Sequence, residues 1–300
     1  MRLFDLHCDT LTKLLPTAYT LADNPFQVSL SGAAAFSAYR QFFAAFIPDA
    51  LHGDEAAFYF QRLAARFRQE MAGTQAFPGF RGYLSVENCM ASSGTLAGVA
   101  RFWEQGVRMA SLTWNGDNAF ACGCHTKNDL GLSLLGRETV RLFCRDGIVT
   151  DLSHLSAKGI SQVLALTEYY GGRVAASHSN CLTATNAAAR RRALSDAQVR
   201  ALAERGAPLG LNLYAPFLAD GAAGEADVLR NIERALTQGA GRSLALGCDF
   251  DGCEPVPAFA GVAKLPALYA AVERGFSRQL ADALFFENAA RFFEKAENKA

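Results

Sequence analysis

The sequence has little charge and no excess of either sign. Only 19% of its 300 residues are charged, and 29 lysines and arginines balance 29 aspartates and glutamates. A protein that holds nucleic acid or an anionic membrane surface by electrostatic attraction needs a basic field, which this balance does not supply. We therefore expect neither nucleic acid nor a membrane as a partner.

Long apolar runs and a secretion signal are also lacking. No apolar stretch approaches the ~20 residues that a membrane-spanning helix needs. The chain opens on the polar motif Asp5-Leu6-His7-Cys8-Asp9, without a basic segment followed by an apolar one. The eight cysteines do not show the dense spacing of a small secreted disulfide scaffold. We expect a cytoplasmic protein whose cysteines are mostly reduced.

The sequence does have enough apolar residues for a large core, since half of them are hydrophobic. Short apolar runs alternate with amphipathic segments, which predicts a parallel sheet flanked by helices. The expected strands are Arg2–Asp9, Gln41–Pro48, Arg81–Glu87, Val107–Trp114, Ile148–His154, Arg173–His178, Pro208–Leu213 and Ser243–Asp249. Eight such repeats predict a TIM-like (β/α)8 barrel that forms a single domain over residues 1–300, because such barrels typically take ~250 residues.

Helical patterns separate most of these strands. Ser195 is expected to cap one helix, and Gly147 and Gly206 stand where two others should end. The last helix, roughly Ser277–Lys295, is expected to pack outside the barrel. The segment Thr10–Ala35 fits no clean helix, so we expect a long loop over the barrel mouth.

Metal-competent side chains recur at the C-terminal ends of the expected strands, where barrels of this class place their active sites. They are His7, Asp9, Glu87, His154, His178 and Asp249. Each alone has an ordinary explanation, because a buried histidine is more often a hydrogen-bonded core residue, and a carboxylate can cap a helix or serve a turn. Together, three imidazoles and three carboxylates on one rim would be costly to bury without a counter-charge.

Nitrogen and oxygen donors of this kind suit zinc best, with manganese, iron and cobalt as alternatives. Five or six ligands exceed one tetrahedral set, and a glutamate between two histidine-containing halves is a natural bridge. The pattern therefore predicts two metal ions. Such a pair, about 3.5 Å apart, can share a hydroxide and polarise a substrate carbonyl, which is the chemistry of a hydrolase.

The chain resembles the membrane dipeptidase (renal dipeptidase) family of zinc peptidases, within the amidohydrolase-like barrels. The resemblance spans nearly the whole chain in family order. The matching stretches are Asp5–Asp9, Ser85–Glu87, Leu112–Asn115, Gly136–Glu138, Val149–Ser156, Ser177–Asn180 and Gly247–Gly252. It implies a distorted barrel with two zinc ions.

The resemblance also implies a role for each metal ligand. His7 and Asp9 would bind one zinc ion. His154 and His178 would bind the second, and Glu87 would bridge the two. All five family ligand positions are intact in this chain.

Two further residues take their expected roles from the resemblance. Asp249 would be the carboxylate that accepts and returns a proton. An arginine downstream of the second zinc-binding histidine would pair with the C-terminal carboxylate of a dipeptide, a task that suits its planar fork. Arg192 fits the family register because it stands four residues before Asp196, which opens a helix. Arg190 and Arg191 compete for the role.

The chain departs from its relatives beside the expected site. Trp114 stands where well-studied members carry a histidine that touches the substrate, and Ala193 replaces the usual asparagine after the arginine. Asn115 and His125 are candidates to replace the lost contact. Trp114 and Asn115 are therefore interpreted as substrate-binding residues, and the departures leave substrate preference open.

The leading hypothesis is a binuclear zinc dipeptidase, including activity on dipeptides with a D-residue at the C-terminal position. A second hypothesis is another amide hydrolase on the same barrel, acting on an N-acyl amino acid or a cyclic amide. A third is a barrel that binds a ligand without turnover. By family analogy alone we expect a homodimer.

Overall fold

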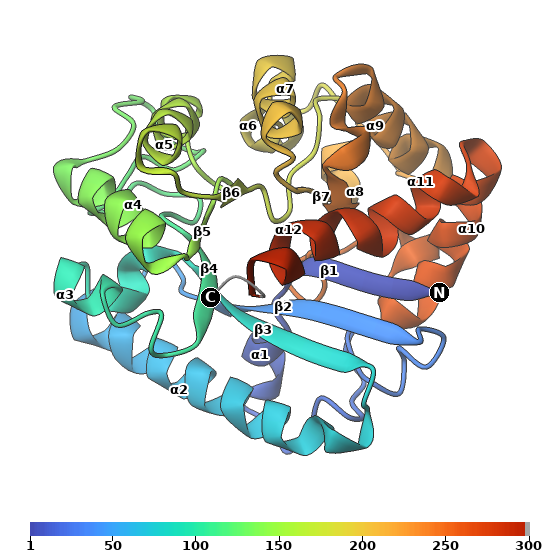
Figure 1. Cartoon of the computed structure of the whole chain (residues 1–300), viewed down its shortest axis with the longest axis horizontal. Coiled ribbons are helices and arrows are strands. Elements are labelled where there is room, and N and C mark those ends of the chain that lie inside the picture. Colours follow the sequence, from blue (N-terminus) through green and yellow to red (C-terminus); the bar gives the residue numbers. More distant parts are fainter. Residues whose placement is uncertain (298–300) are drawn as a thin grey trace. The chain divides into compact units, whose positions relative to one another are not determined.

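A computed structural model describes residues 1–297 of the chain. Its strands are β1 (Arg2–Cys8), β2 (Ala38–Phe46), β3 (Phe80–Glu87), β4 (Val107–Ser111), β5 (Val149–Asp151), β6 (Val174–Ala175), β7 (Leu209–Leu211) and β8 (Leu244–Leu246). They form one sheet in the order β6-β5-β4-β3-β2-β1-β8-β7 (Figure 1). Ala176, directly after β6, forms a parallel bridge with Leu209 of β7, so the two ends of this order meet. The predicted TIM-like (β/α)8 fold is confirmed.

Helices alternate with these strands along the chain. The α-helices are α1 (Thr10–Leu14), α2 (Gly53–Ala72), α3 (Leu96–Val99), α4 (Leu134–Asp146), α5 (Ala157–Tyr170), α6 (Ala187–Arg192), α7 (Asp196–Arg205), α8 (Ala215–Leu218), α9 (Glu225–Thr237), α10 (Leu265–Gly275), α11 (Arg278–Asp282) and α12 (Asn288–Glu297). Short 3-10 turns cover Gly73–Ala76, Cys89–Ser92, Ala240–Arg242, Pro257–Phe259 and Val262–Lys264.

The eight strands lie where the sequence predicts them, but the later ones are shorter. The expected strand Ile148–His154 ends at Asp151, and Ser243–Asp249 ends at Leu246. The reason is the backbone of the site residues, because His154 and Asp249 have φ angles of 69° and 61°. A residue with a left-handed backbone conformation cannot continue a strand. The two strands therefore end before His154 and Asp249.

Backbone contacts divide the chain into two compact units, which are described separately. The first unit comprises Met1–Phe42, Glu70–Gly82 and the described residues from Ala176 onward. The second comprises Phe43–Gln69 and Tyr83–Ala175. The single domain over residues 1–300 stays a prediction.

Within the second unit, the helix α2 packs through aromatic side chains. Phe67 of α2 lies 6.0 Å, between ring centroids, from Phe43 of β2, and Phe60 lies 5.5 Å from Phe102. The helices α4 and α5 pack side by side (Figure 1). Gly147 ends α4 with a φ of 78°, the left-handed stop that the sequence predicts.

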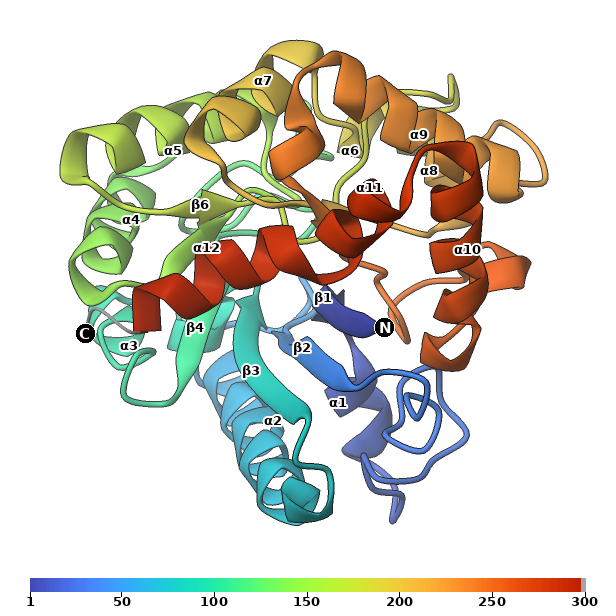
Figure 2. The ribbon, with the colours of Figure 1, turned by 45° about the vertical axis from the view of Figure 1, so that its right-hand side comes forward.

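The first unit is built around β1, whose residues after Arg2 are all buried. The helix α12 packs against β1 (Figure 2), and Phe4 stacks on Phe42 with ring centroids 6.2 Å apart. The predicted last helix, Ser277–Lys295, begins at Arg278, and the Ser277 side chain caps it. It is not one regular helix, because a π-helical turn over Ala283–Glu287 joins α11 to α12.

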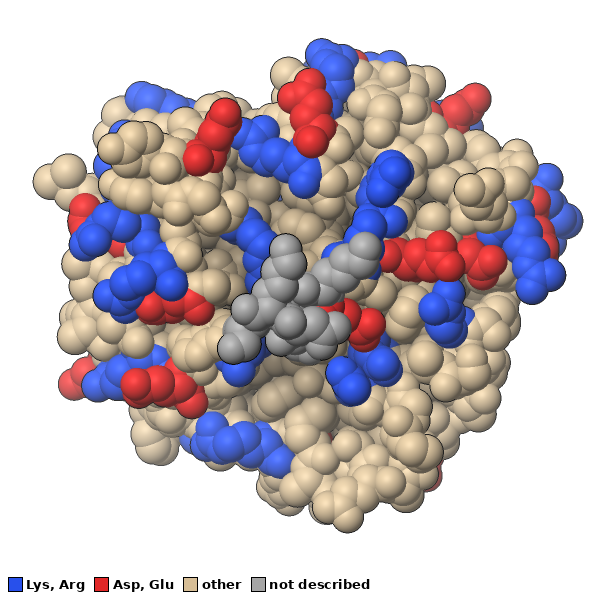
Figure 3. Space-filling model, viewed as in Figure 1, with Lys and Arg blue, Asp and Glu red and all other residues tan. Residues whose placement is uncertain are grey.

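The surface matches the balanced composition of the chain. Basic and acidic side chains are interspersed on the face that Figure 3 presents. Across residues 1–297, every helix is too short or too polar to cross a bilayer.

Candidate metal centre

Three polar side chains of the first unit converge at the ends of β1 and β8. His7 Nε2 lies 3.4 Å from Asp9 Oδ2 and 3.8 Å from Asp249 Oδ1. One ligand atom from each residue lies within 4.8 Å of the other two. Side chains two apart on a strand share a face, which is why the spacing of His7 and Asp9 brings them together. Asp249 joins them because β8 is hydrogen-bonded to β1.

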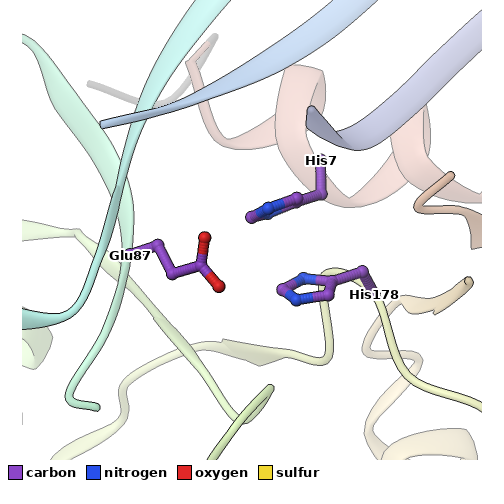
Figure 4. A group of neighbouring side chains, drawn as sticks. All are labelled: His7, Glu87 and His178. Atoms are coloured by element: carbon purple, nitrogen blue, oxygen red, sulfur yellow. The ribbon is translucent and has the colours of Figure 1, made fainter. Parts of the chain in front are cut away.

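His178, which follows β6, adds a second imidazole to this cluster. Its ring centroid lies 3.8 Å from that of His7, and Figure 4 shows the two rings facing each other. Ser177 Oγ lies 2.6 Å from His178 Nδ1 and occupies that nitrogen. Nε2 is therefore the nitrogen of His178 that is suited to bind a metal.

The charge and polarity of this cluster fit a divalent cation. Asp9 is buried, and its Oδ1 has no hydrogen-bond partner within residues 1–297. Burial, together with the neighbouring Asp9 carboxylate, raises the pKa of Asp249 to about 6. The buried Asp9 carboxylate and the half-buried Asp249 carboxylate, beside two imidazoles, repel each other unless a positive charge is shared. The donors are nitrogen and carboxylate oxygen, the set that zinc accepts.

Gly252 makes the close approach of the two carboxylates feasible. A Cβ atom at this position would collide with Asp9 Oδ2 and lie 2.7 Å from Asp249 Oδ1. Only glycine leaves this space empty. From the sequence alone, the Asp251-Gly252 pair indicates a turn and does not reveal this steric role.

Asp251 is a turn residue, as the sequence indicates, with a φ of 67°. Its carboxylate also accepts hydrogen bonds from Thr10 Oγ1 at 2.6 Å and from the Gln27 backbone N–H at 2.9 Å. These bonds hold the first residue and an interior residue of the predicted mouth loop, Thr10–Ala35. The loop prediction was wrong for Thr10–Leu14, which form α1, because a five-residue helix is too short to show a helical period.

Arg192 differs from its two neighbours in burial. Arg190 and Arg191 are exposed, whereas Arg192, the last residue of α6, is buried. It donates from Nη2 to the His178 carbonyl oxygen at 3.1 Å, and its guanidinium lies 5.6 Å from the Phe217 ring centroid. Its buried Nε has no hydrogen-bond partner among the described residues. Of the three arginines, Arg192 is the one that lies beside a predicted ligand.

The second unit holds the other two predicted ligands in direct contact. Glu87 is the last residue of β3, and His154 follows β5. His154 Nε2 lies 2.9 Å from Glu87 Oε1, and both side chains are buried. The sequence pattern placed both residues on strand ends, and β4 lies between those two strands in the sheet.

Asn115 orients the His154 ring. Its Oδ1 lies 2.9 Å from His154 Nδ1, and because a carbonyl oxygen only accepts, Nδ1 carries the proton. Nε2 then presents its lone pair towards Glu87, an arrangement that a shared cation would stabilise. The sequence analysis assigned Asn115 to substrate binding, which stays a prediction, and missed its contact with His154.

Trp114 stands beside the same histidine. Its ring centroid lies 6.3 Å from that of His154 and 5.1 Å from that of Phe46, in an edge-on arrangement. Both Trp114 and Phe46 are half-buried. An aromatic pair therefore borders one predicted ligand at the position where the family carries a histidine.

The polar support beneath Glu87 was not predicted. Asn88 is fully buried with a φ of 78°, and its Nδ2 donates to the Ile47 carbonyl oxygen at 3.0 Å. Its Oδ1 accepts from Asn118 Nδ2 at 3.0 Å. This residue connects the segments that follow β2, β3 and β4. The available signal was a lone amide directly after a strand end.

The whole length of the chain matches one protein family. A sequence model of the membrane dipeptidase family (peptidase family M19) matches residues 1–300. The chain belongs to this family. The predicted resemblance is confirmed.

Two yeast dipeptidases are similar in sequence to this chain. An uncharacterized dipeptidase of Schizosaccharomyces pombe is 29% identical over 223 residues, covering 70% of this chain and 53% of that protein. A second dipeptidase of the same yeast is 29% identical over 224 residues, covering 71% and 52%. The chain thus spans about half the length of the curated relatives it matches.

Solved structures share the fold over the whole chain. A metallopeptidase from Rhodobacter sphaeroides, liganded with a phosphinate mimic of the dipeptide L-Ala-D-Ala, has a TM-score of 0.87 at 24% identity. The alignment covers 98% of this chain and 99% of that one. A dipeptidase of family M19 has a TM-score of 0.87 at 25% identity, covering 98% of both chains. The barrel of this chain is therefore the barrel of the membrane dipeptidase family.

Proposed function

We propose that the protein is a binuclear zinc dipeptidase that hydrolyses the peptide bond of dipeptides, including those with a D-residue at the C-terminal position. The observation that carries the proposal is the cluster of buried His7, Asp9 and His178 with half-buried Asp249, in a chain of the membrane dipeptidase family. The dipeptide mimic in the Rhodobacter sphaeroides relative has a D-residue at this position, which supports the stereochemical part.

The proposed ligand set divides by role. His7 and Asp9 would hold one zinc ion, and His154 and His178 the other. Glu87 would bridge the two ions. Support comes from the contacts within each unit, His7 with Asp9 and His154 with Glu87, and from the buried Asp9 oxygen that lacks another partner.

Asp249 is the proposed acid/base residue. Bound zinc would supply activation of a water molecule and polarisation of the scissile carbonyl. Asp249 accepts the proton that the attacking water loses and returns it to the leaving amine. Burial raises the pKa of Asp249 to about 6, which suits a group that must both take and give a proton near neutrality.

Arg192 is the proposed carboxylate clamp. Its planar fork pairs with a carboxylate in two parallel hydrogen bonds, and its buried Nε has no partner among the described residues. Binding of the substrate's C-terminal carboxylate here would fix the distance to the scissile bond. Only short peptides would then place that bond at Asp249.

The aromatic pair formed by Trp114 and Phe46 favours a second candidate function. An indole ring lacks the acceptor nitrogen of the family's histidine, and its apolar face suits an acyl group or an apolar side chain. The alternative is hydrolysis of an N-acyl amino acid or a cyclic amide on the same barrel.

A substrate panel on zinc-loaded protein tests both functions. The panel contains dipeptides with L- or D-residues at the C-terminal position, N-acetylated amino acids and a cyclic amide, each with and without a chelator. Chelator-sensitive cleavage of dipeptides is expected. Preference for the acylated or cyclic substrates would replace the proposed function by the second candidate. Absence of both turnover and bound metal would favour a binding protein.

We also propose a compartment and an assembly. The cytoplasm is the proposed compartment, because the eight cysteines do not show the dense spacing of a small secreted disulfide scaffold. The homodimer rests on family analogy. Sedimentation of the purified chain measures the assembly directly.

A further inference from the structure

The proposed acid/base residue has a dedicated hydrogen-bond donor. Asn212, fully buried just after β7, donates from Nδ2 to Asp249 Oδ2 at 3.0 Å. The other carboxylate oxygen, Oδ1, is the one that lies 3.8 Å from His7 Nε2. The hydrogen bond thus assigns separate tasks to the two oxygens of Asp249.

The amide of Asn212 is held in one orientation. Its Oδ1 accepts from the Tyr214 backbone N–H at 2.7 Å, which identifies Nδ2 as the donor towards Asp249. Its backbone is held as well, because Asn180 Oδ1 accepts from the Asn212 N–H at 3.0 Å and Asn180 Nδ2 donates to the Asn212 carbonyl at 3.0 Å. Asn212 cannot rotate its donor away without breaking a buried bond.

The rigidity of Asn212 matters because a fixed backbone does not by itself fix the carboxylate of Asp249. The Asp249 backbone has a φ of 61°, and its N–H donates to the His7 carbonyl oxygen at 3.2 Å. The side chain can still rotate about its own bonds. A fixed donor on one oxygen selects one rotamer and one face.

We propose that Asn212 is the positioning residue of this site: it fixes the Asp249 carboxylate by one oxygen so that the other faces the reacting groups. The inference rests on the proposed function of Asp249. The Asn212 amide also donates to the His178 carbonyl oxygen at 3.5 Å, but its only bond to a side chain of the proposed catalytic set is to Asp249, so Asn212 would act through Asp249.

The test is an isosteric substitution with a matched control. Asn212→Asp keeps the acceptor for Tyr214 and the shape, but replaces the donor by a second carboxylate oxygen. We expect kcat to fall on the order of 10- to 100-fold, as for other residues that orient a site, while KM changes less than about threefold and two zinc ions stay bound.

The control, Asn231→Asp, alters another buried asparagine, which donates to the Cys181 carbonyl oxygen and to Thr183 Oγ1. It should cost stability and leave the kcat of the folded protein within about twofold.

A charge swap provides a readout that does not depend on turnover. In Asn212→Asp with Asp249→Asn, the new amide donates to the new carboxylate and the hydrogen bond returns with reversed polarity. We expect the double variant to unfold at a higher temperature than the sum of the two single effects predicts, while remaining inactive. Additive melting temperatures, or an unchanged kcat in Asn212→Asp, would overturn the inference. If the wild-type chain cleaves no dipeptide, the proposed function fails, and the melting temperatures still decide whether Asn212 holds Asp249.

Discussion

The space beside Gly252 sets how closely two charged groups approach in this site. A methyl group there would collide with Asp9 and press on Asp249, both of which lie within reach of His7. Neither carboxylate can retreat freely, because both are held among buried neighbours. The absence of a Cβ atom at Gly252 therefore allows His7, Asp9 and Asp249 to lie this close together.

Gly252→Ala is expected to weaken zinc binding at least tenfold and to reduce activity in parallel, because Asp9 must move from its position. Isothermal titration of metal-free protein measures the affinity. Gly221→Ala is the matched control, since a Cβ at Gly221 meets no atom within 4 Å. Equal zinc affinity in the two variants would contradict the steric role of Gly252.

Asp5 lies one strand period before His7, inside the first unit. Burial raises the pKa of Asp5 to about 6, although backbone N–H groups of Cys248 and His7 hydrogen-bond to its carboxylate. The folded state therefore binds the Asp5 proton more tightly than the unfolded state does, whose pKa is near 3.8. The stability that Asp5 contributes is present below pH 3.8 and is lost as pH rises through about 6.

Asp5→Asn should remove this dependence, because the amide keeps an acceptor for the Cys248 N–H and carries no charge. We expect the metal-free variant to gain stability relative to wild type as pH rises from 4 to 7. Urea unfolding at several pH values measures the difference. A constant difference across that range would mean that Asp5 titrates alike in both states.

At the scale of elements, one turn residue bonds two parts of the mouth loop. Asp251 accepts from Thr10 in α1 and from Gln27 in the loop, and its own N–H donates to Gln27 Oε1 at 2.7 Å. Asp251→Ala should free the loop while leaving the predicted zinc ligands in place. We expect limited proteolysis within residues 15–35 to become several-fold faster. Asp23→Asn, which changes an acceptor of Ser31 within the same loop, is the control. Unchanged cleavage would show that other contacts hold the loop.

The elements also show what could be predicted from the sequence. Apolar runs that end in His or Asp identified the strands and their functional ends, because buried strands and polar site residues differ sharply in chemistry. The partners of those residues could not be predicted. Asn212 bonds a residue 37 positions away and Asn115 one 39 positions away, and nothing local marks such an amide. The π-helical turn before α12 was missed because its residues have ordinary helical periodicity.

At the scale of the whole molecule, the predicted ligands fall in both compact units. His7, Asp9 and His178 belong to the first, and Glu87 and His154 to the second. Ligands this far apart in the sequence are brought to their positions only in the folded chain. Metal binding should therefore be coupled to folding of the entire chain.

Removal of zinc is expected to lower the melting temperature in a single transition. A ligand at a thousand times its dissociation constant stabilises a protein by about 4 kcal/mol, which corresponds to roughly 8 °C for a chain somewhat larger than 250 residues. Calorimetry with and without chelator measures the shift, and metal analysis should find two zinc ions per chain.

A pair of histidine variants tests where the zinc binds. His154→Ala should lose much of the shift in melting temperature, because the variant lacks one ligand of the second unit. His52→Ala, which removes an exposed histidine outside the strand ends, should keep the full shift. If His52→Ala and His154→Ala respond alike to chelator, the zinc that stabilises this chain binds elsewhere.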